Sequence, residues 1–278
     1  MDVPDLFSLP LSPAREAVLL GGASAVVLAC SPLLSAVCVR YLSARQEAVS
    51  AGAQVDAPLR SLIPGRRPFL LSPVFLAALM AFPLGVGAWQ AWEHGRVLLF
   101  VLGAPVVALT CTAACVDLYA HLLPNRLLGL GALWAGLVCP LALLARSVIH
   151  DAAPAVSASS PLPAPAALRS PACTAQAWGV ALGCAVALGV LGLVLHMLGG
   201  LGMGDVKLYA LMGLWLGLYG LFWPLAAFVI GAFAGGVMAL GVGLARIVTH
   251  RGRGEPFAYG PPLVVGMIVA WLLLLAQG

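Results

Sequence analysis

Charged residues are scarce in this chain, and that scarcity excludes a soluble globular protein. Only 9% of the 278 residues are Asp, Glu, Lys or Arg, whereas 62% are hydrophobic. In soluble domains about a quarter of the residues are charged. We therefore predict an integral membrane protein.

The sequence also lacks the motifs of several common chemistries. Its seven cysteines contain no C-x-x-C pair, which excludes a zinc ribbon and a redox dithiol. It contains no G-x-S-x-G, H-E-x-x-H or Cys-His pattern, so no serine, zinc or cysteine hydrolase motif is present. The acidic start, MDVPDLFSLPLSPARE, differs from the cationic start of a secretory signal, and we expect no cleaved signal peptide. We predict no cofactor and no metal.

Long apolar runs are what the chain does contain. A helix needs roughly 20 apolar residues to cross a bilayer. Several segments reach this length, and we predict eight spans, at 17–39, 72–92, 97–116, 127–148, 174–198, 207–222, 225–245 and 262–276. The sixth is short, and we place its boundary with the seventh at Trp223 and Pro224. The sequence thus predicts an all-α, polytopic membrane helix bundle that forms one domain, residues 1–278.

The positions of the cations predict the topology. Ten of the 14 Lys and Arg residues fall in one set of loops and four in the other, which places the first set in the cytoplasm and both chain ends outside. Loop 41–71 is then a basic cytoplasmic linker, and the Pro/Ala/Ser-rich loop 150–173 is extracytoplasmic. Topology accounts for the net charge of +4, so we expect a lipid bilayer and no nucleic acid as a partner.

Two carboxylates stand next to predicted spans on the same side. Asp117 closes the third span and Asp205 follows the fifth, so both reach the cytoplasmic face. Ionisable groups at membrane depth are costly and indicate function. Two carboxyls that share one proton can act together as acid and base, with one activating water and the other protonating a peptide carbonyl or its leaving amine.

The residues around Asp205 suit a substrate site. Gly202 and Gly204 let the backbone leave helical geometry, so that a peptide can approach. We expect Asp205 to be the N-cap of the sixth span, where the positive helix end stabilises its charge. The simpler alternative is that Asp205 is only a cap and that Lys207 reaches lipid headgroups.

The residues after Asp117 predict a turn. Pro124 and Asn125 open the fourth span and end a short turn that holds Asp117 near the surface. The simpler alternative is that Asp117 is an ordinary residue at the end of a helix. We interpret His121 and His196 as buried hydrogen-bond formers, not as ligands.

Three stretches resemble motifs of the type IV prepilin peptidases. GMGDVKLYALMGLWLG resembles their G-x-G-D signature, including Lys207 two positions after the aspartate. VDLYAHLLPNRL is similar to their first aspartate motif, in which Pro and then Asn or Asp follow the Asp after seven residues. EPFAYGPPLVVG resembles their P-F-G-P segment, here interrupted by Ala258 and Tyr259. The order and spacing agree from residue 117 to residue 266.

The resemblance implies an aspartic endopeptidase of the bacterial inner membrane, with eight spans and its active site facing the cytoplasm. Members of this family remove short cationic leaders from prepilin and pseudopilin precursors. The resemblance makes Asp117 and Asp205 the catalytic pair, and it gives supporting roles to Gly202, Gly204, Lys207, Pro124 and Asn125. Larger members also methylate the new N-terminus and carry C-x-x-C motifs after the first span. Loop 41–71 has no cysteine, so we expect the short form without methyltransferase activity.

Two other functions stay open. Membrane carboxylates also form proton relays, so a proton-coupled transporter is the main alternative. A pilus-assembly scaffold without catalysis is the third.

Overall fold

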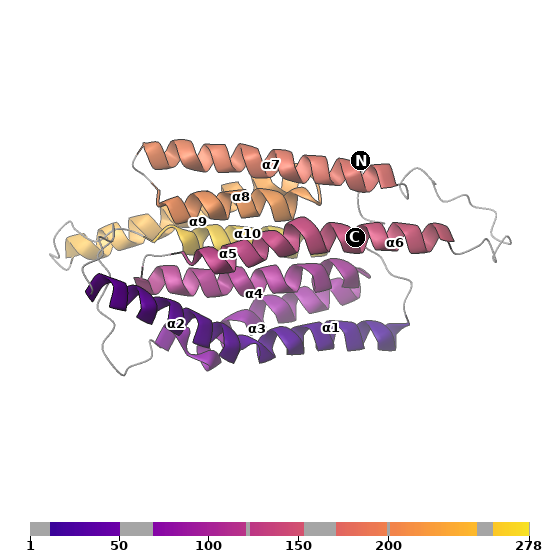
Figure 1. Cartoon of the computed structure of the whole chain (residues 1–278), viewed down its shortest axis with the longest axis horizontal. Coiled ribbons are helices and arrows are strands. Elements are labelled where there is room, and N and C mark those ends of the chain that lie inside the picture. The colour runs from indigo at the N-terminus through magenta and orange to yellow at the C-terminus, as the bar shows by residue number, and fades with distance from the viewer. Residues whose placement is uncertain are drawn as a thin grey trace.

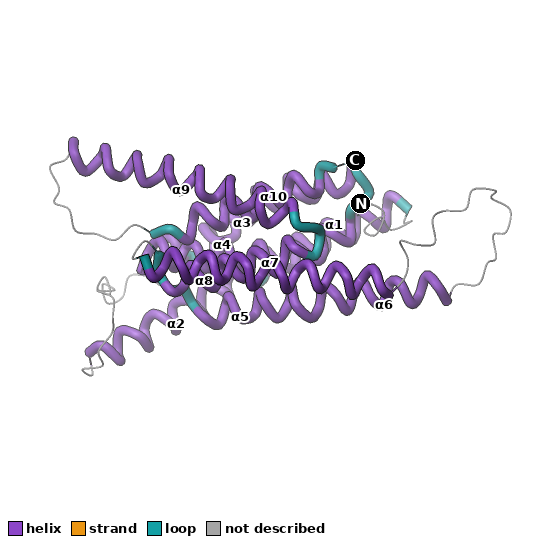
Figure 2. Tube along the Cα trace, turned by 90° about the horizontal axis from the view of Figure 1, so that it is seen from above, coloured by secondary structure: helices purple, strands orange, loops and turns teal. Residues whose placement is uncertain are grey.

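A computed structural model describes residues 12–50, 69–120, 123–152, 171–198, 201–248 and 258–277. These ranges are almost entirely helical and contain no strand. Figures 1 and 2 show the helices running side by side along one long axis. The predicted all-α membrane helix bundle is confirmed.

Each predicted apolar segment corresponds to helical structure. The α-helices are α1 Pro13–Ala29, α2 Ser31–Ser50, α3 Pro73–Glu93, α4 Val97–Ala120, α5 Asn125–Leu133, α6 Cys139–Ala152, α7 Pro171–Met197, α8 Met203–Gly217, α9 Phe222–Val248 and α10 Gly260–Leu275. A 3₁₀ turn, η2, covers Phe69–Leu71, and a π-helical turn, η3, covers Trp134–Val138 between α5 and α6.

Six helices among the described residues are long and apolar enough to cross a membrane. They are Pro13–Ala48, Pro73–Glu93, Val97–Ala120, Asn125–Ala145, Ala175–Met197 and Phe222–Ala245. Helix α10 is shorter but apolar, and α8 has 15 residues. Exposed apolar side chains such as Val229, Phe233 and Leu240 on α9 are suited to contact with lipid. The chain is therefore a multi-pass membrane protein.

The predicted start of loop 41–71 was wrong. The first helical segment continues through α2 to Ser50, because the polar residues Arg45, Gln46 and Glu47 are good helix formers. The rest of loop 41–71, up to residue 68, and residues 153–170 of loop 150–173 lie outside the described residues.

The boundary between the sixth and seventh segments lies before Trp223 and Pro224, not at them. Helix α8 ends at Gly217 and α9 begins at Phe222. Gly220 makes the turn with φ of +116°, a conformation that favours glycine. Pro224 sits in the first turn of α9, where its missing N–H costs no helical hydrogen bond.

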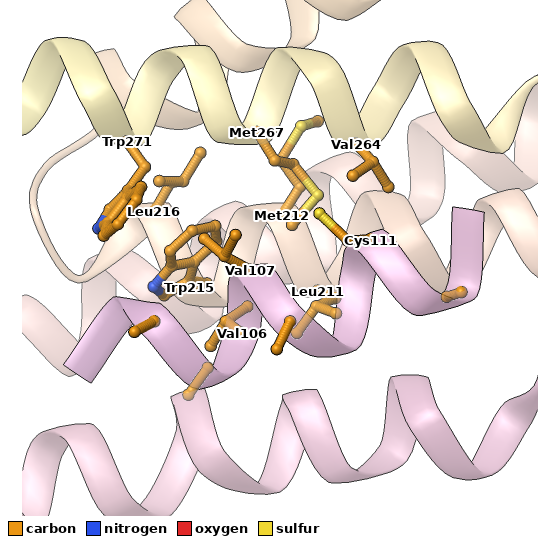
Figure 3. Packing of buried hydrophobic residues seen from close by; sticks show 14 of the residues in the cluster. Val106, Val107, Cys111, Leu211, Met212, Trp215, Leu216, Val264, Met267 and Trp271 are labelled. Carbon is orange, nitrogen blue, oxygen red and sulfur yellow. The ribbon is translucent and has the colours of Figure 1, made fainter. Parts of the chain in front are cut away.

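Helix α4 lies at the centre of the bundle and is buried along most of its length, where it contacts α1, α3, α5 and α10. Figure 3 shows side chains of α4, α8 and α10 meeting in the core. The ring centroids of Trp271 and Phe100 are 5.7 Å apart, and those of Trp271 and Trp215 are 6.3 Å apart. A Cβ atom at Gly87 would lie 2.8 Å from the Trp271 ring, and one at Gly103 would also collide with it. The two glycines therefore form the recess that holds Trp271.

Helices α7 and α8 pack closely through a G-x-x-x-G pair. A Cβ atom at Gly217 would lie 2.8 Å from Cα of Ala181, and one at Gly213 would overlap the backbone of Cys184. Small residues at this spacing let two membrane helices approach closely. The pair fixes α8 against α7, and thereby fixes the start of α8.

We expect Gly213→Ala to destabilise the bundle by about 1–3 kcal/mol, because the added methyl group has no space. The measurement is thermal unfolding of the purified protein in detergent. The matched control is Gly183→Ala on α7, where an added Cβ meets nothing within 4 Å. Equal melting temperatures for the two variants would show that the α7–α8 packing is described wrongly.

Candidate active site

Asp117 lies in the last turn of α4 and is buried by the start of α10. Its side chain is only 6% exposed. Its Oδ2 accepts a hydrogen bond from the backbone N–H of Gly260 at 3.1 Å. The expectation that a turn holds Asp117 near the surface was therefore wrong for the side chain, because the first residue of α10 covers it.

The sequence Gly260-Pro261-Pro262 explains why α10 binds a carboxylate here. The first N–H groups of a helix have no partner inside the helix and carry partial positive charge. Pro261 and Pro262 have no N–H, so Gly260 supplies the donor of this first stretch. A Cβ atom at Gly260 would lie 2.6 Å from Oδ2 of Asp117. Only glycine fits this contact without displacing the carboxyl group.

Asp205 is also buried, with 6% exposure. Its side chain lies in the first turn of its own helix and bonds back to the residue before that helix. The N-cap of α8 is Gly202, and Asp205 is the third helical residue. Its Oδ2 accepts the N–H of Gly202 at 3.1 Å, while its own N–H donates to the Gly202 carbonyl at 3.0 Å. The predicted N-cap role of Asp205 was wrong in register, because α8 begins at Met203 and not at 207. The side chain nevertheless accepts the N–H of the N-cap residue, Gly202.

The structure brings the two aspartates together. They come from α4 and α8, and their carboxyl groups are close enough to interact electrostatically. Toward the left of Figure 1, α4 ends and both α8 and α10 begin. Two carboxyls that are both buried and interact electrostatically disfavour a double negative charge, so the pair is suited to share one proton.

The other predicted site residues lie at the starts of α5 and α8. Pro124 is the N-cap of α5 and Asn125 its first residue, as predicted. Lys207 and Asn125 are both exposed, and Nζ donates to Oδ1 at 2.7 Å, which joins α8 to α5. A Cβ atom at Gly204 would lie 2.7 Å from Cβ of Leu123. Gly204 thus lets Leu123, which stands just before α5, pack onto the start of α8.

Two tyrosines and Gly260 were missed as site residues. Tyr209 lies one turn beyond Asp205, is 1% exposed, interacts electrostatically with Asp205 and shares a side-chain hydrogen bond with Tyr259. Tyr259 precedes Gly260 and packs on α9, where a Cβ at Gly235 would lie 2.7 Å from its ring. The one sequence feature that could have drawn attention to Tyr259 and Gly260 was the Ala258-Tyr259 insertion in the third motif. Glu255 of that motif lies outside the described residues.

His196 forms the predicted hydrogen bond, with its Nδ1 at 2.7 Å from the carbonyl oxygen of Leu201, but the residue is half-buried and not buried as expected. His121, Gly199 and Gly200 lie outside the described residues. Across the described ranges, no three His, Cys, Asp or Glu side chains form a group able to hold a metal ion.

Comparisons of the chain with models of protein families, with curated proteins and with solved structures find no match in any of the three.

We expect Asp117→Asn and Asp205→Asn each to stabilise the folded protein. An Asn side chain can still accept the glycine N–H, but it removes one of two interacting buried acids. At low pH both wild-type carboxyls are protonated and resemble the amide, so the gain should be small. At high pH the wild type must bury ionised carboxylate, so the gain should increase.

The measurement is the melting temperature in detergent across the pH range. Each kcal/mol relieved should raise it by about 2–4 °C. Glu47→Gln on the exposed face of α2 is the control and should change nothing. A gain that does not depend on pH would argue against interacting carboxyls.

Proposed function

We propose that the chain is an aspartic endopeptidase of the bacterial inner membrane that cleaves the cationic leaders of prepilin or pseudopilin precursors. The observation that supports this most directly is the meeting of two buried carboxyl groups from distant parts of the sequence. The resemblance of three motifs to prepilin peptidases adds the substrate class. Two of those motifs contain the aspartates, and the third provides Gly260.

The proposed reaction is hydrolysis by an aspartate pair that begins with one proton. The ionised carboxylate takes a proton from water while the water oxygen attacks the scissile carbonyl carbon. The protonated carboxyl donates its proton to the developing oxyanion. The tetrahedral intermediate then collapses and the C–N bond breaks. The protonated carboxyl gives its proton to the leaving amine, and the other carboxylate takes a proton from a hydroxyl group of the intermediate as the carbonyl reforms, so the pair again holds one proton.

Backbone hydrogen bonds orient the pair for this chemistry. Oδ2 of Asp117 is bound by Gly260, and Oδ2 of Asp205 by Gly202. We assign the second oxygen of each carboxyl, Oδ1, to the shared proton and the water. Because the donors are backbone groups at helix starts, they need little rearrangement when charge moves between the two acids.

The position of the pair fits a substrate with a charged leader and an apolar helix. Asp117 is in the last turn of its helix and Asp205 in the first turn of its own. The concentration of cations in the predicted cytoplasmic loops supports the proposal that this end of the bundle faces the cytoplasm. A cationic leader could stay in water there while the helix that follows it lies in the bilayer. Loop 41–71 has no cysteine, so we propose no methyltransferase activity.

A proton-coupled transporter remains the alternative. Transporters commonly bind substrate near the midplane of the bilayer, between discontinuous helices. Here both carboxyls lie at helix ends, which favours a reaction at the membrane boundary. Uptake into proteoliposomes that depends on a pH gradient, without peptide cleavage, would favour the transporter.

Purified protein in detergent should cleave a peptide that joins a short cationic leader to an apolar segment. We expect Asp117→Asn and Asp205→Asn each to lower the cleavage rate by about 10²–10⁴-fold, because each removes one partner of the acid–base pair. Glu93→Gln, an exposed residue at the end of α3, is the control and should cleave at the wild-type rate. Full activity in either aspartate variant would rule out the pair.

We also expect Gly260→Ala to lower the cleavage rate by about 10²-fold, because its methyl group must displace the Asp117 carboxyl. Gly236→Ala on α9 is the matched control, since a Cβ there meets nothing within 4 Å. If the Gly260 variant cleaves like the control, the start of α10 does not hold the catalytic Asp117.

A further inference from the structure

A single peptide group connects His196 to Asp205. Its carbonyl belongs to Leu201 and its N–H to Gly202. The carbonyl oxygen lies 2.7 Å from Nδ1 of His196, and the N–H donates to Oδ2 of Asp205 at 3.1 Å. A carbonyl oxygen can only accept, so His196 must donate through Nδ1–H. The chain of hydrogen bonds therefore runs from the imidazole through the peptide to the carboxyl group.

This arrangement links the end of one helix to the start of the next. His196 is in the last turn of α7, and Gly202 is the N-cap of α8. Gly202 is in an extended conformation, with φ of −76° and ψ of 154°, so the Leu201–Gly202 peptide lies outside the regular helix. A donor bound to the carbonyl fixes the plane and polarises the peptide, which makes its N–H a stronger donor.

We propose that His196 is a positioning residue for Asp205, acting through the Leu201–Gly202 peptide. It orients the N–H that holds Oδ2 and strengthens that hydrogen bond to the carboxylate. The kinetic part of this inference rests on the proposed peptidase activity. The structural part does not, because it concerns the tautomer of His196 and the strength of the Gly202 hydrogen bond.

Other titratable groups also face Asp205. Among the described residues they are Asp117 from α4 and Tyr209 from α8, and Tyr209 is in turn bonded to Tyr259 at the start of α10. Lys207 is exposed and donates to Asn125. His196 differs from these groups in acting on the N–H that Asp205 accepts, so its removal should change that hydrogen bond selectively.

Two variants separate positioning from simple packing. His196→Leu removes the donor and keeps an apolar side chain of good helix propensity. His196→Asn keeps a donor, since its Nδ2 can occupy the place of Nδ1. The matched control is His94→Leu. His94 also has Nδ1 near a backbone carbonyl, that of Gln90 at 2.9 Å, but it lies at the end of α3.

The first test needs no enzymatic activity. In ¹⁵N NMR spectra of the protein in detergent at alkaline pH, we expect neutral His196 in the Nδ1–H form, with its signals assigned from the His196→Asn variant. We expect the Gly202 amide proton, assigned from Gly202→Ala, to be shifted downfield. His196→Leu should move it upfield, whereas His196→Asn and His94→Leu should leave it in place. An unprotonated Nδ1, or a Gly202 signal unmoved by His196→Leu, would overturn the proposal.

The second test is kinetic and uses the cleavage assay. We expect His196→Leu to lower kcat by about 10–10²-fold with little change in KM, because the misplacement affects the reacting group and not substrate binding. The acidic limb of the pH profile should move to higher pH, since the carboxylate loses part of its stabilising hydrogen bond. His196→Asn should restore most of both. If His196→Asn is as impaired as His196→Leu, the effect is packing and the proposal fails.

The two tests keep this inference distinct from the proposed function. A wild-type protein that cleaves no leader peptide would overturn the peptidase proposal alone, because the NMR test still decides whether His196 controls the Gly202 hydrogen bond. If the wild-type protein cleaves the leader peptide but His196→Leu leaves the Gly202 amide signal unchanged, only the positioning role of His196 is overturned.

Discussion

The structure depends on keeping two acidic groups together where water is scarce. Each of Asp117 and Asp205 is almost fully buried, and each interacts with the other across helices that are far apart in sequence. Left without partners, such carboxylates would cost several kcal/mol. Each instead accepts one backbone N–H from the start of a helix, a donor that the fold would otherwise leave unsatisfied. Each buried carboxyl group therefore gains a hydrogen-bond donor, and each helix N-terminus gains an acceptor for one of its free N–H groups.

Glycine residues make these hydrogen bonds between carboxyl groups and helix N-termini possible. Both donors are glycine N–H groups, and at Gly260 a side chain would collide with the carboxyl itself. Gly204 lets Leu123, which stands just before α5, come close to the helix that carries Asp205. Such crowding and charge burial lower stability, a cost that proteins commonly carry at functional sites. The glycines in these motifs are explained by contacts, not by flexibility.

Sequence reasoning succeeded where the physics is local or follows from topology. Apolar length identified the helices, and counting spans placed Asp117 and Asp205 at the same end. It failed at the start of α8, because a glycine-rich segment gives no strong signal for where a helix begins; the helix starts at Met203, and Asp205 is its third residue. The link between Tyr209 and Tyr259 could not be found, since it depends on how α8 and α10 pack. The contact of Gly260 with Asp117 spans 143 positions and has no local signature.

The recess that holds Trp271 has a consequence at the opposite end of its helix. Trp271 and Gly260 belong to the same rigid rod, α10, and each residue of a helix advances it by about 1.5 Å. Because Trp271 fits between Gly87 and Gly103, α10 cannot slide by even one residue along its neighbours. Arg96 reinforces this, donating to the carbonyl of Leu274 at 2.6 Å. The axial register of α10, which brings the Gly260 N–H to Asp117, is thus set several turns away by the packing of the Trp271 indole ring against two residues that lack a Cβ atom.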